Sequence, residues 1–236
     1  MIKDFIKELK TSDYLLVGVS GGSDSMALLD MLYKLNLNLI VCNVNYKTRK
    51  ESDYEEKLVK DYCLKRNILF FSKIVNYYLK GNFEEFARVE RYKFFKEIYE
   101  QYNCKYLVVA HHLNDSLETY ILQKRRNNIV KHYGLDYKTN LMNMNVIRPL
   151  VNVNKEEILN YCLINNIEYS IDESNYDNKY ARNKIRNMEL SKLDAIEIRK
   201  LIKKMNKDNE INDLFFKNLN DGQLQDTYNY IVHIFP

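Results

Sequence analysis

The sequence has little glycine, proline or cysteine and no tryptophan. Its 236 residues include 6 Gly, 2 Pro and 4 Cys. No two cysteines form a CxxC pair, so neither a zinc knuckle, an iron–sulfur site nor a disulfide framework is indicated. No stretch reaches the roughly 18 apolar residues of a membrane span, and the first ten residues lack the apolar core of a signal peptide. We therefore expect a cytoplasmic protein with reduced thiols and no membrane partner.

Charge is uneven along the chain. The formal net charge is only +4, but residues 177–207 contain ten Lys/Arg against four Asp/Glu. Residues 208–236 reverse this balance, with one Lys against five acidic residues. A basic segment of this kind is either a solvated helix face or a surface that contacts a nucleic-acid backbone.

Short apolar runs alternate with segments of helical period, which predicts a parallel, twisted sheet with helices on both faces. In such a sheet, ligands bind beyond the carboxyl ends of the strands. A further helix is predicted over 155–165, and the chain from about 179 onward reads as helical and charged. The expected strands are 14–19, 39–44, 68–74 and 106–110, and the expected helices between and after them are 25–35, 51–66, 83–102 and 114–126.

Half of the glycines lie in one short segment, at positions 18, 21 and 22. The loop after the first strand has the sequence SGGSDS, from Ser20 to Ser25. Glycine lets backbone amides approach a ligand closely, and a helix start offers unpaired N–H groups to an anion. We therefore expect a phosphate at this loop, which is neither a Walker A loop nor a dinucleotide fingerprint. The alternative is a tight turn with a serine as the helix cap.

SGGSDS after the first strand resembles the SGGxDS signature of the PP-loop, or N-type ATP pyrophosphatase, superfamily. The resemblance implies an adenine nucleotide alpha hydrolase-like fold and cleavage of ATP between its α and β phosphates. It also implies ATP binding by the loop, with Asp24 either orienting Mg²⁺ or accepting hydrogen bonds. The ATP-binding residues would be Ser20, Gly21, Gly22, Ser23, Asp24 and Ser25.

Four further segments resemble the tRNA(Ile)-lysidine synthetase family within this superfamily. They are HHLNDSLET (111–119), ARVERYKFF (87–95), RPL (148–150) and the pair DESN (172–175) with RNKIR (182–186). Three positions depart from the family pattern: Tyr46 replaces the usual His, and Asn114 and Ser116 replace Asp and Gln. Together the motifs cover roughly residues 14–187.

This resemblance implies a ligase that uses ATP to adenylate the C2 carbonyl oxygen of the wobble cytidine in the CAU anticodon of tRNA(Ile). The ε-amine of free lysine then displaces AMP. The implied catalytic residues are Asp24, Arg88, Arg91, His111 and Asp115. The residues implied to contact lysine or tRNA are Arg125, Arg126, Asp172, Asn175, Arg182, Asn183 and Arg186.

Two alternatives stay open at this point: a tRNA thiolase of the same superfamily, and a catalytically inactive nucleotide- or RNA-binding module. We expect a PP-loop domain over 1–187 and a helical extension over 188–236. Longer family members carry additional C-terminal domains, so a short form is expected here. A homodimer is expected by resemblance only.

Overall fold

The computed structural model describes residues 6–48, 51–77, 81–127, 130–171 and 181–217. The chain forms two compact units, each built from separate stretches of sequence. The first unit comprises residues 1–113 and 137–172, and the second comprises residues 114–136 and 173–236. The domain boundary expected near residue 187 stays a prediction.

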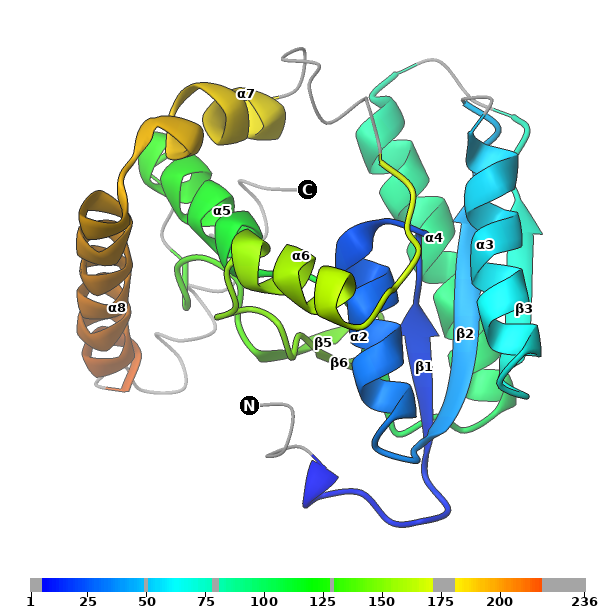
Figure 1. Cartoon of the computed structure of the whole chain (residues 1–236). Helices are drawn as coiled ribbons and strands as arrows, with labels where there is room; N and C mark the ends of the chain where they lie inside the picture. Colours follow the sequence, from blue (N-terminus) through cyan, green and yellow to red (C-terminus); the bar gives the residue numbers. More distant parts are fainter. Residues whose placement is uncertain (1–5, 49–50, 78–80, 128–129, 172–180, 218–236) are drawn as a thin grey trace. The chain divides into compact units, whose positions relative to one another are not determined.

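The first unit is built on a six-stranded sheet with the order β3-β2-β1-β4-β6-β5. Figure 1 shows β2 between β1 and β3. Strands β1 to β4 and β6 pair in parallel, as predicted, whereas β5 pairs antiparallel with β6 at the sheet edge. A two-residue turn at Met142 and Asn143, both with positive φ, joins these last two strands. The strands are β1 (Tyr14–Gly18), β2 (Asn38–Asn45), β3 (Leu69–Ile74), β4 (Tyr106–Val108), β5 (Lys138–Leu141) and β6 (Met144–Ile147).

Two apolar cores cover the two faces of this sheet. Alternate residues of one strand point to opposite faces, so Leu15 and Val17 belong to one core and Leu16 to the other. The first core includes helices α2 (Ser23–Tyr33), α3 (Ser52–Leu64) and α6 (Lys155–Ile164), and the second includes α4 (Phe83–Gln101). Burial on both faces explains why the strands read as continuous apolar runs.

Gly18, at the end of β1, lets α4 pack closely on the sheet. A Cβ atom at this position would lie 2.8 Å from two ring carbons of Phe95. The first glycine of the cluster therefore serves packing rather than ligand binding, in agreement with its predicted place inside the strand.

The second unit contains α5 (Leu113–Arg125), α7 (Ala181–Met188), the 3₁₀ turn η2 (Leu190–Lys192) and α8 (Ala195–Lys217). Helix α8 is fixed to α5 by Asp208, which accepts a hydrogen bond from Tyr120 at 2.9 Å and pairs with Lys124 at 3.0 Å. Gly134, at φ +79°, packs closely against Ser116 of α5, because a Cβ there would lie 2.6 Å from Ser116 Oγ. No helix among the described residues is long and apolar enough to cross a membrane.

Candidate functional site

A cavity of about 220 Å³ lies at the carboxyl ends of β1, β2 and β4 in the first unit. An open parallel sheet binds its ligands at this edge. The cavity therefore lies where the sequence predicts ligand binding. Polar groups come from the SGGSDS loop, α4 and His111, which lies three residues after β4, and apolar walls come from β2 and α4. The lining includes Ser20, Gly22, Asp24, Ser25, Cys42, Val44, Tyr46, Arg91, Tyr92, Phe95, Ala110 and His111.

The SGGSDS loop is closed by its own hydroxyl groups. Ser25 Oγ donates to the Gly22 carbonyl at 3.0 Å and accepts from the Ser20 amide at 3.2 Å. Helix α2 begins at Ser23, and its N-cap, Gly22, makes no side-chain cap hydrogen bond. The turn is tight, but its N-cap is Gly22 rather than a serine. The first turn of a helix has backbone N–H groups of the kind that bind anions.

The two loop glycines meet different requirements. Gly21 has φ +95°, and a Cβ there would lie 3.1 Å from Glu55 Cβ and 3.3 Å from Glu55 Cα, so the turn and its packing on α3 need glycine. Gly22 has an ordinary φ of −76°, and its Cβ would meet only Ser20 Oγ, at 3.7 Å. A side chain at Gly22 is compatible with the fold but would enter the space beside the loop.

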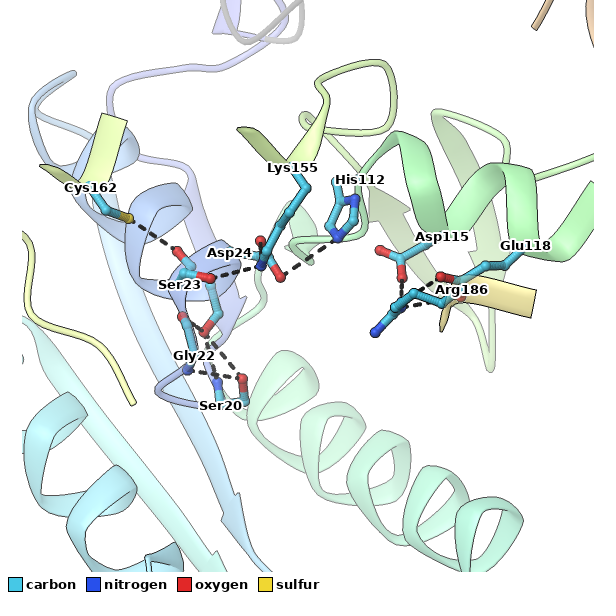
Figure 2. Close-up of polar contacts among 11 residues, drawn as sticks. Ser20, Gly22, Ser23, Asp24, His112, Asp115, Glu118, Lys155, Cys162 and Arg186 are labelled. Carbon is cyan, nitrogen blue, oxygen red and sulfur yellow. Dashed lines mark hydrogen bonds and ion pairs between the residues drawn. The ribbon is translucent and has the colours of Figure 1, made fainter. Parts of the chain in front are cut away.

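Asp24 is held by a lysine that the sequence analysis did not single out. Lys155 Nζ lies 2.6 Å from Asp24 Oδ1 and 2.8 Å from Ser23 Oγ, and His112 Nε2 lies 3.7 Å from Asp24 Oδ2 (Figure 2). Mg²⁺ at nucleotide sites is commonly bound by one or two carboxylates together with substrate phosphates. Asp24 also lines the cavity, so its carboxylate fits that requirement.

The structure separates the two arginines of α4. Arg91 lines the cavity, whereas Arg88 is exposed and is not among its lining residues. Both guanidinium groups lie near the ring of Tyr92: that of Arg91 is 5.7 Å from the ring centroid and that of Arg88 is 4.9 Å from it. Of the two arginines implied to be catalytic, only Arg91 therefore lies at the cavity.

Tyr46 is one of the positions at which the sequence departs from the pattern that it resembles. Its hydroxyl donates to the Ala87 carbonyl of α4 at 2.6 Å, and its ring meets Phe83 edge-on at 5.9 Å. Burial raises the pKa of Tyr46 to about 12. The residue therefore joins β2 to α4 as a neutral phenol and forms part of the cavity wall.

A second polar cluster lies in the second unit, where α7 meets α5. Arg186 Nε donates to Glu118 Oε1 at 2.6 Å and Nη2 to Oε2 at 3.2 Å, and Nη2 also donates to Asp115 Oδ1 at 3.1 Å (Figure 2). Arg182 donates to Thr119 Oγ1 at 3.2 Å. Burial raises the pKa of Glu118, and the Arg186 guanidinium opposes that shift. Glu118 was not predicted as a site residue, although it lies within the quoted motif.

Arg125 pairs with Glu189 at 2.5 Å, Arg126 is exposed, and Asn183 on α7 is partly exposed. Asp172 and Asn175 lie outside the described residues. The structure therefore brings Asp24, Arg91 and His111 to one cavity, and Asp115 and Arg186 to one cluster.

Comparison with known proteins gives the class of the chain. Residues 1–193 match the PP-loop domain family, and the chain belongs to that family. Membership implies ATP use. Within it, the chain is 44% identical over 208 residues to a tRNA(Ile)-lysidine synthase of Mesoplasma florum, covering 86% of this chain and 52% of the relative. It is 37% identical to the same enzyme of Ureaplasma parvum, with 87% and 63% covered.

The chain thus spans only about half the length of the first of these relatives.

Solved structures agree on the fold. A U34-tRNA thiolase from Methanococcus maripaludis superposes with a TM-score of 0.66 at 19% identity, covering 88% of this chain and 80% of that one. An NH3-dependent NAD synthetase from Campylobacter jejuni gives 0.51 at 16% identity, with 89% and 91% covered. At these identities the likeness concerns the fold alone.

Proposed function

We propose that the chain acts as a tRNA(Ile)-lysidine synthase, joining free lysine to C2 of the wobble cytidine in a CAU anticodon at the expense of ATP. The observation that carries the proposal is the 44% identity with a protein of that name. Two features of the chain support it: a cavity behind the SGGSDS loop and a cluster of carboxylates held by arginine. The first serves the nucleotide and the second serves an amine.

In this proposal, the SGGSDS loop holds the phosphates of ATP. Backbone N–H groups at the start of α2 bind phosphate oxygens, and the hydroxyls of Ser20 and Ser25 add donors. Asp24 would hold Mg²⁺ together with the phosphates, and the ion would supply positive charge to the departing pyrophosphate. Arg91 and His111 line the same cavity and stabilise the negative charge that develops during adenylation.

Lysine binding is assigned to carboxylates. Asp115, oriented by Arg186, is the described residue proposed to bind the ε-ammonium group and accept its proton, and Asp172 is proposed for the same task. The deprotonated amine attacks C2, the new C–N bond forms, and the C–O bond to AMP breaks. Both electrons of the broken bond leave with AMP.

The RNA backbone is assigned to exposed basic groups. On α8 these are Arg199, Lys200, Lys203, Lys204 and Lys207, all exposed, to which Arg126 is added. Arg182, Asn183 and Arg186 of α7 were predicted for tRNA, but Arg182 and Arg186 already contact groups on α5. The exposed lysines of α8 are therefore the cleaner test of RNA binding, because each phosphate contact adds to the salt dependence of affinity.

A thiolase requires a reactive thiolate, and the four cysteines of the chain do not offer one. All four are buried, and burial raises the pKa of each thiol. A buried thiol with a raised pKa is a poor nucleophile or cluster ligand at neutral pH. This observation favours lysidine formation over sulfur transfer.

The test is transfer of label from radioactive lysine to tRNA. The chain is incubated with ATP, Mg²⁺, labelled lysine and transcripts carrying a CAU or a CAC anticodon. We expect label on the CAU transcript only, with one AMP released per lysine. If no label is transferred but AMP is released in the presence of another acceptor, the chain has a different PP-loop activity. If no ATP is used at all, the chain is an inactive module.

A further inference from the structure

Lys155 reaches the SGGSDS loop from a different element, helix α6. Its ammonium group lies 2.6 Å from Asp24 Oδ1 and 2.8 Å from Ser23 Oγ, so one cation bridges two consecutive side chains of the loop (Figure 2). Helices α2 and α6 pack in the same core of the first unit. The side chains of Asp24 and Lys155 are 28% and 35% exposed, which leaves the pair partly shielded from water.

The position of Lys155 on α6 is fixed by the start of the helix. Asn154 and Glu157 form a capping box, so Lys155 is the first residue of α6. A cation at a helix N-terminus opposes the helix dipole, whereas an anion there is favourable. The positive charge of Lys155 therefore does not stabilise its own helix, and its direct partners are Asp24 and Ser23 on α2.

Asp24 would be unfavourable for ATP without such a partner. Its carboxylate lies in the first turn of α2 and lines the cavity in which the phosphates are proposed to bind. A free carboxylate there repels the phosphate charges and also competes with them for the backbone N–H groups. A neighbouring ammonium group offsets part of that repulsion and fixes one carboxylate oxygen of Asp24 by a direct contact.

We propose that Lys155 is a positioning residue that neutralises and orients Asp24, so that the loop accepts the phosphates of ATP before a metal ion is bound. This inference rests on the proposed use of ATP. It predicts that Lys155 lowers the dependence of ATP binding on Mg²⁺. It also predicts that the effect of Lys155 requires the Asp24 carboxylate.

The experiment measures equilibrium binding of ATP to the full chain, once with EDTA and once with millimolar Mg²⁺. Lys155→Met removes the positive charge with little change in side-chain length, and Lys155→Arg keeps the positive charge. Lys34→Met is the matched control, because Lys34 pairs with Asp30 on the same helix and does not line the cavity. In EDTA we expect Lys155→Met to weaken ATP binding by about three- to tenfold. Lys155→Arg and Lys34→Met should bind like the wild type.

Two comparisons make the result specific. Millimolar Mg²⁺ should reduce the difference between Lys155→Met and wild type, because the metal ion then neutralises Asp24. In an Asp24→Asn background, Lys155→Met should have no further effect, because no carboxylate remains to be neutralised. Thermal unfolding shows that each variant is folded, and Lys155→Gln provides the same test if Lys155→Met is not.

Several results would overturn the inference. One is an unchanged ATP affinity of Lys155→Met in EDTA, and another is an equal loss of ATP affinity with and without Mg²⁺. A third is an equal loss of ATP affinity in the Asp24→Asn background, which would mean that Lys155 binds phosphate directly. Binding of ATP to wild type only when Mg²⁺ is present would also refute it. Failure of wild type to bind ATP under either condition would instead refute the proposed function, so the two failures are distinguishable.

Discussion

Replacement of Arg186 by methionine tests the carboxylate cluster of the second unit. Glu118 is fully buried, with 0% of its side chain exposed, and Arg186 makes two hydrogen bonds to it. Breaking a buried ion pair by removing one partner typically costs about 3–5 kcal/mol, because a charge is left buried without compensation. Since the Arg186 side chain is 32% exposed, we expect the lower end, about 3 kcal/mol, near pH 8.

This loss should depend on pH in a defined direction. Burial raises the pKa of folded Glu118 above its ordinary value of 4.5, and Arg186 opposes that shift. A carboxyl with a raised folded pKa binds protons more tightly when folded, so its contribution to stability falls as pH rises through the window between the unfolded and folded pKa. Without Arg186 the folded pKa rises further. The penalty of Arg186→Met is therefore largest at high pH and shrinks as Glu118 becomes protonated.

Urea unfolding followed by circular dichroism at about pH 8 and about pH 5.5 measures this difference. Arg125→Met is the matched control, because Arg125 pairs with Glu189 at the surface, where both partners are at least one-third exposed, and should cost at most about 1 kcal/mol at either pH. Adding Glu118→Gln to Arg186→Met should recover more than half of the loss at the higher pH. An equal loss at the two pH values, or a loss no greater than that of Arg125→Met, would refute the reasoning.

Three further predictions concern the nucleotide loop, the cavity wall and α8. Gly22→Val should abolish ATP binding and cost less than about 1 kcal/mol of stability. Gly21→Ala should destabilise the fold by about 1–3 kcal/mol, because Gly21 has a positive φ. Equal melting temperatures of the two variants would contradict this difference. Tyr46→Phe should raise KM for ATP and leave kcat nearly unchanged, because the lost hydrogen bond holds α4; a fall in kcat alone would argue against this role. Replacing Lys203 and Lys207 by Gln should weaken tRNA binding and lower its salt slope by about 2, and an unchanged slope would remove α8 from the RNA surface.

The sequence predicted most of the first unit because its signals are local. Apolar runs and helical periods placed β1 to β4 and the helices after them within a few residues, and the SGGSDS loop marked the cavity. The hairpin of β5 and β6 was not predicted, because its turn, Met142-Asn143, has no glycine to mark positive φ. Lys155 was missed for a different reason: 131 residues separate it from Asp24, and only tertiary packing joins them.

Glu118 shows a third limit of sequence reasoning. An acidic residue in a charged helix is most often solvated, and only the fold shows that this one is buried against Arg186. Similarly, Arg88 and Arg91 share a helical face by spacing, but only Arg91 lines the cavity. Spacing predicts which residues share a face, and packing decides which of them reach a cavity.

The division of the chain into two units bears on how the protein can be dissected. The chain passes from one unit to the other after residues 113, 136 and 172, so neither unit is a single continuous piece of sequence. A deletion that removed α8 would take away Asp208, and with it the partner of Tyr120 and Lys124 on α5. Expression of either unit alone therefore requires a circularly permuted or relinked chain rather than a truncated one.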